Sequence, residues 1–403
     1  MKTSSKYLVI AALLLSSIAN KTTAQDSTQT EKNQKILMAL PGNTKMLLTG
    51  VAWFGFHANM NDTIKTNVKN SFNTYGFSPM FLWKLSDKMF FESEIEINNG
   101  EMELEYAKIS YKLNKFMTVG AGRMLTPFGA YGERWEPVHI EKFPNSHLRP
   151  NDDLLPDDTH LYWGAIMGID VRGGIPLGSA KMNYSMFVSN GPLLSKDENG
   201  RPTGVVQYEN LLDENNNNKE VGGRIGILPF SNSSLEIGFS GKHGLAGDIG
   251  DTVYENIGAT ATAVDFSYLK SIEAIKSTIS FRGQYNTLTV DKANYYLTDS
   301  TTYTFDNTMK NYYAQFSIRP SMAHGKCIKK TELMFRYSSM ALPKDAIWCP
   351  KDKNGKGGII TRMDIGLCYW LNWRSGLRFA YEITTMPDGT KQNQLLALLA
   401  VGL

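Results

Sequence analysis

The sequence predicts an all-β fold, a transmembrane antiparallel up-and-down β-barrel of about 16 strands. Three observations lead to this prediction. Apolar and polar residues alternate in segment after segment, full charges stand in the middle of the polar faces, and connections alternate between long and short. No apolar run approaches the length of about eighteen residues that a membrane-spanning helix needs, so helical spanning is excluded.

The first 24 residues have the pattern of a secretory signal peptide. Lys2 and Lys6 precede the apolar run 7–18, which is too short to span a bilayer, and small residues up to Ala24 mark a cleavage site. A retained membrane anchor is the alternative. Removing residues 1–24 takes away three lysines and no acidic residue, which leaves basic and acidic residues equal in number. This balance gives no support to nucleic-acid binding.

After the signal peptide, residues 25–45 are expected to form a short periplasmic segment and residues 46–403 the barrel. The segment is polar apart from the apolar patch 36–40, which Pro41 and Gly42 end. From residue 46 onward the period-2 alternation of strands dominates. The expected strands are 46–57, 71–84, 88–98, 102–113, 116–125, 162–172, 180–189, 220–228, 235–243, 257–268, 277–288, 309–319, 331–340, 359–370, 375–385 and 393–403.

The alternation itself favours a membrane barrel over a soluble sandwich. In the strand 331–340, Leu333 and Phe335 share one face, and Glu332 and Arg336 share the other. A sandwich also alternates, with its apolar face inward. Repeated full charges on one face and aromatic or aliphatic residues on the other fit water inside and lipid outside. The segment 393–403 differs because both of its faces are apolar. A strand is predicted there, with a terminal helix as the alternative.

The connections support the same architecture. Short turns such as Ser86-Asp87 and Asn114-Lys115 follow even-numbered strands, as expected at the periplasmic end of an outer-membrane barrel. Both termini then lie in the periplasm. Most connections after odd-numbered strands are long and are expected outside, at 58–70, 126–161, 190–219, 244–256, 289–308 and 341–358. Within the connection 190–219, the asparagine run 215–218 is interpreted as a mobile loop tip that faces the outside.

Charged residues on the polar strand faces are the candidates for lining a pore. An arginine wall would concentrate anions, and an opposed acidic wall would create a transverse field. The alternative is that these charges pair with acids such as Glu332, Asp364 and Glu382 and only solvate the wall. The basic candidates are Arg123, Arg282, Arg319, Arg336, Arg362 and Arg378, with Arg224 as a further one, and the acidic candidates are Glu92, Glu94 and Glu96, with Glu103 and Glu105 nearby.

The long connection 126–161 is the candidate constriction. It follows the strand ending Thr126-Pro127-Phe128-Gly129 and is much longer than connections in compact domains usually are. Its acidic stretch 151–158 could offer oxygens to Ca²⁺, but it lacks EF-hand spacing, so no metal site is predicted and solvated loop charge is the alternative. The candidate constriction residues are Arg134, Trp135, Lys142, Arg149, Asp152 and Asp153.

Nothing in the sequence predicts an enzyme or a cofactor. There is no nucleophile elbow, zinc motif or P-loop, and the six histidines have no ligand spacing. Three cysteines, Cys327, Cys349 and Cys368, are an odd number at wide spacings and form neither a disulfide framework nor a metal pattern.

Three stretches, 104–134, 167–192 and 221–241, resemble the phosphate-selective porin family (porins O and P). Within the first, GRMLTPFG is similar to the family's strand-end motif. The resemblance implies a sixteen-stranded, often trimeric, water-filled barrel in the outer membrane, with the third external loop folded inward. The strand count independently makes 126–161 that third loop. The loop lacks a lysine-rich cluster, so phosphate specificity is not carried over.

The expected function is therefore that of an outer-membrane porin. It would let small hydrophilic solutes diffuse passively, with anions the class that an arginine wall would favour. Its partners would be outer-membrane lipid, the solutes and, by the resemblance, two further copies in a homotrimer. The alternatives are a plugged barrel that acts as a surface receptor or assembly scaffold, and a barrel hydrolase with a catalytic site on its loops.

Overall fold

The structure, a computed structural model, describes residues 37–39, 45–60, 70–135, 140–148, 164–208, 214–298 and 301–402. The chain divides into two compact units, Met1–Ile36 and Leu37–Leu403, and every described residue belongs to the second. The predicted signal peptide lies outside the described residues, as do Arg149, Asp152 and Asp153 of the candidate constriction.

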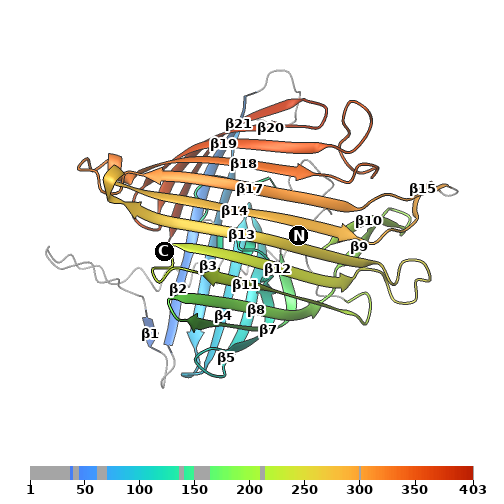
Figure 1. Cartoon of the computed structure of the whole chain (residues 1–403), viewed down its shortest axis with the longest axis horizontal. Helices are drawn as coiled ribbons and strands as arrows, with labels where there is room; N and C mark the ends of the chain where they lie inside the picture. Colours follow the sequence, from blue (N-terminus) through green and yellow to red (C-terminus); the bar gives the residue numbers. More distant parts are fainter. Residues whose placement is uncertain are drawn as a thin grey trace, which may run out of the picture. The chain divides into compact units, whose positions relative to one another are not determined.

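Sixteen strands in the described part of the chain form one closed antiparallel sheet (Figure 1). Each strand pairs with the next one of the barrel, and β21 pairs with β2, which closes the sheet. The predicted barrel and its strand number are thereby confirmed. The strands are β2 (Lys45–Asn59), β3 (Ser71–Lys84), β4 (Met89–Asn98), β5 (Glu101–Lys112), β6 (Thr118–Leu125), β7 (Ala165–Leu177), β8 (Ala180–Asn190), β11 (Lys219–Leu228), β12 (Leu235–Leu245), β13 (Gly258–Ile272), β14 (Ser277–Val290), β17 (Thr308–Arg319), β18 (Thr331–Ala341), β19 (Ile359–Trp370), β20 (Gly376–Thr385) and β21 (Lys391–Gly402).

The remaining elements are short. β1 (Leu37–Ala39) pairs with the first residues of β2, at a level of the barrel that β21 does not reach. Two small hairpins stand in long connections, β9 (Leu193–Lys196) with β10 (Pro202–Gln207), and β15 (Tyr295–Thr298) with β16 (Thr301–Tyr303). The helical turns are η1 (Tyr131–Trp135), η2 (Glu273–Ile275) and η3 (Ile328–Lys330). None of the helices in the described residues has the length and apolarity of a membrane span.

The largest difference from the predicted strand ends is at the end of β7. β7 continues to Leu177, five residues beyond the predicted end at 172. Gly173, Gly174 and Pro176 belong to the ladder, because their partners on β8 continue in register through this stretch. Elsewhere the predicted ends agree with the structure to within a few residues. β21 is a strand, as predicted.

The two faces of the wall are as the alternation predicted. On β18 the apolar Leu333 and Phe335 are exposed on the outer face, and Glu332 and Arg336 are buried on the inner face. Most of the long connections leave one end of the barrel, here called the loop end. Short turns, such as 178–179 between β7 and β8, lie at the other end, here called the turn end, together with the longer connection 320–330 between β17 and β18.

Candidate constriction inside the barrel

The connection 126–164 between β6 and β7, here called loop 3, enters the barrel. At its neck the amide and the hydroxyl of Thr126 both donate to the carbonyl of Gly164, at 3.1 and 2.7 Å. The backbone then turns at Gly129, whose φ of +65° lies in the region that favours glycine. A Cβ at this position would also collide with the side chain of Gln284. The Pro-Phe-Gly sequence is therefore the bend that directs loop 3 inward.

Past the bend, the backbone of loop 3 is held by the inner faces of β12 and β14. Gly129 donates its amide to Ser240 Oγ at 2.9 Å. Ala130 and Tyr131 donate their amides to Gln284 Oε1 at 2.9 and 3.0 Å. These acceptors stand several strands away from β6 around the barrel, so loop 3 crosses the interior. The predicted inward fold of the third loop is confirmed.

The far part of loop 3 is fixed by buried polar side chains on β17, β18 and β19. Lys142 Nζ contacts Glu332 Oε1 at 2.6 Å and Ser317 Oγ at 2.8 Å. The other oxygen of Glu332 accepts a bond from Trp370 Nε1 at 2.8 Å. Lys142, Glu332 and Ser317 are all buried. Because a buried charge is costly unless paired, these partners stabilise loop 3 in this position.

Arg336 on β18 is the second fixed point. Its Nε donates to Asp364 Oδ2 on β19 at 2.8 Å, and its two terminal nitrogens donate to oxygens of Asn145 and Ser146 in loop 3 at 2.9 to 3.2 Å. Glu141 lies 3.8 Å away. The Arg336 side chain has no exposed surface. Its donors are thus used to bind the loop to the wall.

An apolar contact completes this attachment. Phe143 of loop 3 packs in a buried cluster, and the Arg336 guanidinium lies 4.4 Å from the centre of its ring. Gly366 on β19 makes the room, because a Cβ there would lie 2.8 Å from Phe143 Cε1. The inner face of β21 contributes Leu396 to the same cluster, which explains why this strand is apolar on both faces. The other members of the cluster are Met334, Cys368, Trp370 and Ala380.

The predicted arginine wall therefore lies largely beneath loop 3. Arg378 on β20 is fully buried, like Arg336. Arg362 is buried too, and its Nε lies 3.1 Å from Glu382 Oε1. Arg319 and Arg282 are only partly buried. The first donates to the carbonyl of Lys329 near the turn end, and the second lies over the ring of Trp135, the predicted constriction residue.

On β6, Arg123 stands opposite Ala107 and Met167 in the sheet register, and its side chain is buried. Its guanidinium bonds to Glu103 at 2.7 Å. Glu103 stands opposite Glu96 of the predicted acidic set. Arg224 lies inside, where it binds Asp265 with two nitrogens at 2.6 and 2.9 Å.

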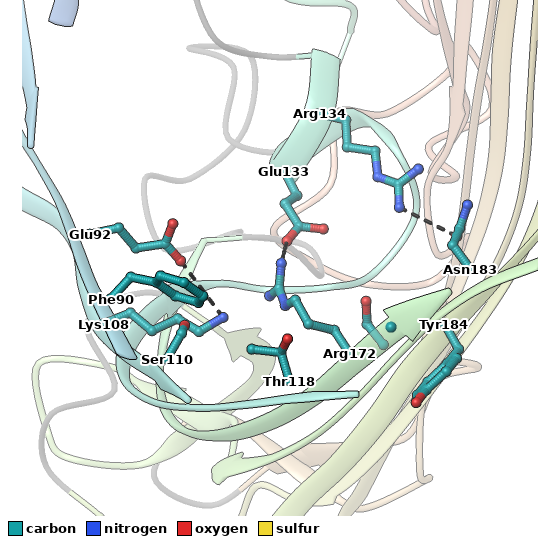
Figure 2. A pocket seen from close by; sticks show the side chains of 12 residues that line it. Phe90, Glu92, Lys108, Ser110, Thr118, Glu133, Arg134, Arg172, Asn183 and Tyr184 are labelled. Atoms are coloured by element: carbon teal, nitrogen blue, oxygen red, sulfur yellow. Dashed lines mark hydrogen bonds and ion pairs between the residues drawn. The ribbon is translucent and has the colours of Figure 1, made fainter. Parts of the chain in front are cut away.

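The opposite side of the interior holds a hollow of about 530 Å³. Its wall comes from β4, β5, β6, β7 and β8, and its other side is formed by Glu133 and Arg134 of η1 in loop 3 (Figure 2). The strand residues that line the hollow lie in the halves of their strands nearer the turn end. The lining includes charges of both signs and several hydroxyl groups, namely Glu92, Lys108, Ser110, Thr118, Glu133, Arg134, Arg172, Asn183 and Ser185.

A chain of ion pairs runs along this hollow. Lys108 Nζ lies 2.8 Å from Asp170 Oδ2, the same oxygen lies 2.5 Å from Arg172 Nε, and Arg172 Nη1 lies 2.5 Å from Glu133 Oε1. Glycine at 120 is required, because a Cβ there would collide with both Lys108 and Asp170. The ion pairs attach loop 3 to β7 through Arg172, about a third of whose side chain is exposed, whereas Lys108 and Asp170 are buried.

The predicted constriction residue Arg134 binds on the other flank of the hollow. Its Nη1 donates to Glu236 Oε1 at 2.8 Å, and Arg224 shares the same oxygen at 3.0 Å. Asn183 donates to that oxygen as well. Sequence reasoning missed Lys108, Asp170, Arg172 and Glu236 as members of this site. The only signal in the sequence was the position of each charge on an inner strand face.

Of the predicted acidic residues, Glu92 reaches the hollow, with its Oε1 4.0 Å from Lys108 Nζ (Figure 2). Glu94 stands on the same face of β4 and accepts a hydrogen bond from the hydroxyl of Ser78 on β3. Glu96 follows on that face. The acidic set thus lies on the open side of the interior, across from the buried arginines.

At the loop end, the long connections pack on one another and on the inner wall. Their apolar cluster includes Phe128 of loop 3, Tyr208, Phe305 and Cys349, and reaches inner residues of β13, β14, β17, β18 and β19. Burial raises the pKa of Tyr208. Lys242 lies 3.4 Å from the centre of the Tyr208 ring and 3.3 Å from Glu220.

The asparagine run 215–218 is only partly exposed, as Asn217 and Asn218 are exposed and Asn216 is buried. The Asn216 amide donates to the carbonyls of Leu245 and Gly247 at 3.2 and 2.9 Å. Asn215 donates to Ala246 and to Asp248. These two side chains therefore attach the run to the neighbouring connection.

Metal chemistry has no support in the described residues, where no group of three or more His, Cys, Asp or Glu side chains is arranged to hold an ion. The acidic stretch 151–158 of loop 3 lies outside them. The three cysteines are free thiols, with Cys327 exposed and Cys349 and Cys368 buried.

No protein-family profile and no curated protein matches the sequence. Solved structures match its fold. OmpF of Salmonella typhi, solved in complex with daunomycin, has a TM-score of 0.57 at 11% identity over 89% of this chain and 98% of that one. An anion-selective porin from Comamonas acidovorans scores 0.53 at 12% identity, covering 89% and 100%. The outer membrane channel DcaP of Acinetobacter baumannii scores 0.52 at 9% identity, covering 89% and 97%. The fold is thus that of the outer-membrane porins.

Proposed function

We propose that this protein is an outer-membrane porin that lets small hydrophilic solutes diffuse passively across the membrane. One observation carries the proposal. Loop 3 is bonded across the interior to the inner faces of β12, β14, β17, β18 and β20, while a hollow of about 530 Å³ stays open between it and β4–β8. A loop that narrows a water-filled barrel without filling it limits solute size and needs no covalent chemistry.

The orientation follows from the same proposal. Long connections would face the outside and short turns the periplasm, as in outer-membrane barrels generally. The exposed apolar outer face would contact lipid, and the predicted signal peptide would direct export. The kinship with phosphate-selective porins, and the homotrimer it implies, rest on the sequence resemblance alone. The likeness in fold at 9–12% identity supports no particular solute.

A plugged barrel used as a receptor or scaffold is the second candidate. It is favoured by the apolar cluster at the loop end, where connections cover the inner wall from β13 to β19. This cluster closes part of the loop-end interior. The hydrolase alternative has no observation of its own.

Planar-bilayer recording of the purified, folded protein separates these candidates. The proposal expects steady ohmic steps, and a folded barrel without steady current would overturn it in favour of the plugged barrel. Deleting residues 130–158 should raise the single-channel conductance, because the constriction is removed. Deleting 198–200, the exposed turn of the β9–β10 hairpin, is the matched control and should leave it unchanged. A band shift on boiling in detergent shows that each variant has folded.

A further inference from the structure

We infer that the open passage prefers cations, and that the hollow is a binding subsite for small organic cations with a primary ammonium group. The inference rests on the proposed function and gives it a solute class. It reverses the expectation from sequence, in which recurring arginines favoured anions. The expectation is reversed because the acidic side chains that line the hollow are more exposed to water than most of the arginines.

Arg282 and Arg319 are partly exposed, the first over the ring of Trp135 and the second near the turn end. The other four basic groups of the arginine-rich side lie under loop 3 beside four carboxylates, so these eight described residues are balanced in charge. All eight side chains are buried, and contact with water is what lets a fixed charge attract mobile ions. The bases are Lys142, Arg336, Arg362 and Arg378, and the acids are Glu141, Glu332, Asp364 and Glu382.

Around the hollow each base is already in contact with an acid. Lys108 binds Asp170, Arg172 binds Asp170 and Glu133, and Arg134 and Arg224 share Glu236, with Asp265 as a further partner of Arg224. Four bases thus face four acids. Among the described lining residues, Glu92 is the acid left over.

Glu92 is also the accessible one. Its side chain is 41% exposed, and its contact with Lys108 at 4.0 Å is long. Lys108 is nearly fully buried and holds Asp170 at 2.8 Å, so it neutralises Glu92 only weakly. Further along the same inner face, Glu94 accepts from the Ser78 hydroxyl and forms no ion pair with any described residue. The open wall therefore presents net negative charge along the passage.

The chemistry of the lining selects an ammonium group. A primary ammonium is a compact cation with three donors, and it can bind one carboxylate while bonding to neutral oxygens. Glu92 supplies the carboxylate, and Ser110, Thr118 and Ser185 supply hydroxyl groups in the same hollow. A volume of about 530 Å³ admits a short aliphatic amine together with water.

Reversal potentials in a KCl gradient test the selectivity. Wild type should pass K⁺ in preference to Cl⁻, and Glu92→Gln should lower that ratio by about two- to fivefold, the range expected for one partly screened charge near the ion path. Glu92→Asp should keep the ratio. Glu198→Gln, the same chemical change at an exposed turn of the β9–β10 hairpin, should leave it unmoved. An anion-preferring wild type, or an unchanged ratio in Glu92→Gln, overturns the inference.

Current block by 1,4-diaminobutane tests the subsite. Brief interruptions of single-channel current are expected in wild type and at several-fold lower frequency in Glu92→Gln, while uncharged 1,4-butanediol should cause none. Equal block in both proteins would show that the amine binds elsewhere. Failure of this inference can be told apart from failure of the proposed function. The selectivity and block measurements require a conducting channel, whereas failure of the proposed function means that no steady current is seen at all.

Discussion

The two sides of the barrel interior use the same kinds of residue for different purposes. On the β17–β20 side, charges are buried and mostly paired, and with Phe143 they fix loop 3 to the wall. On the β4–β8 side, Lys108 and Asp170 form a buried pair, whereas the ion pairs of Arg134 and Arg172 are partly exposed around a hollow. A charged residue on an inner strand face therefore contacts water only where no other part of the chain covers it. The buried side attaches loop 3 to the wall, and in the proposed function the open side supplies the passage.

The largest effect should come from removing a charge on the buried side. Arg336→Ala leaves Asp364 buried without its partner and frees loop 3 at Asn145, so the free energy of unfolding should fall by about 3–5 kcal/mol. Urea unfolding in lipid vesicles measures this. Arg319→Ala is the matched control on the same wall, because that side chain is partly exposed and donates to one carbonyl, for an expected loss of about 1 kcal/mol. Similar losses of unfolding free energy in Arg336→Ala and Arg319→Ala would contradict the special role of the buried arginine.

Overpacking the loop contact should have the next largest effect. Gly366→Ala places a methyl group against Phe143 and should cost about 1–3 kcal/mol. Gly241→Ala on β12 is the control, since nothing lies within 4 Å of its Cβ position. In the same urea assay, combining Gly366→Ala with Phe143→Ala should cost less than the sum of the two single changes. Additive losses would mean that the two residues do not touch.

On the open side the same kind of change should be mild. Glu133→Gln removes one partner of Arg172, which keeps Asp170, so stability should change by less than about 1 kcal/mol. The freed positive charge should instead lower the preference for K⁺ over Cl⁻. A loss of stability as large as that of Arg336→Ala would show that the hollow is as closely packed as the other wall.

Thiol labelling should show the smallest but most local difference. Burial raises the pKa of Cys349 in the loop-end cluster to about 12, so at pH 8 its reactive thiolate is scarce and increases only as the pH rises toward that value. A maleimide should label the exposed Cys327 quickly, and Cys349 only after unfolding. Mass spectrometry after proteolysis reports each site. Rapid labelling of Cys349 in the folded protein would mean that the loop-end cluster opens.

The sequence was sufficient for the wall of the barrel and for the position of loop 3. Strand alternation is a local property, so the faces, the strand number and the long third connection could all be predicted. The Pro-Phe-Gly sequence marked the end of the strand, but the direction in which the bend at Gly129 turns loop 3 could not be read from it.

What could not be predicted depends on contacts between distant residues. Nothing local to Phe143 shows that it fits over Gly366, more than two hundred residues away, and that fit decides which wall loop 3 covers. The asparagine run looked mobile, yet its amides bond to a neighbouring connection. The sequence shows which side chains are present, but their roles depend on which distant residues they contact in the fold.

The central claim is that solutes pass between loop 3 and the β4–β8 wall. In a protein with the three native cysteines changed to serine or alanine, single cysteines placed by Thr118→Cys in the hollow and by Ser338→Cys on the covered inner face of β18 test it directly. A positively charged methanethiosulfonate reagent is added during single-channel recording. Current should drop in the Thr118→Cys channel and stay constant in the Ser338→Cys channel. A drop only in the Ser338→Cys channel would place the passage under the arginines and contradict this assignment.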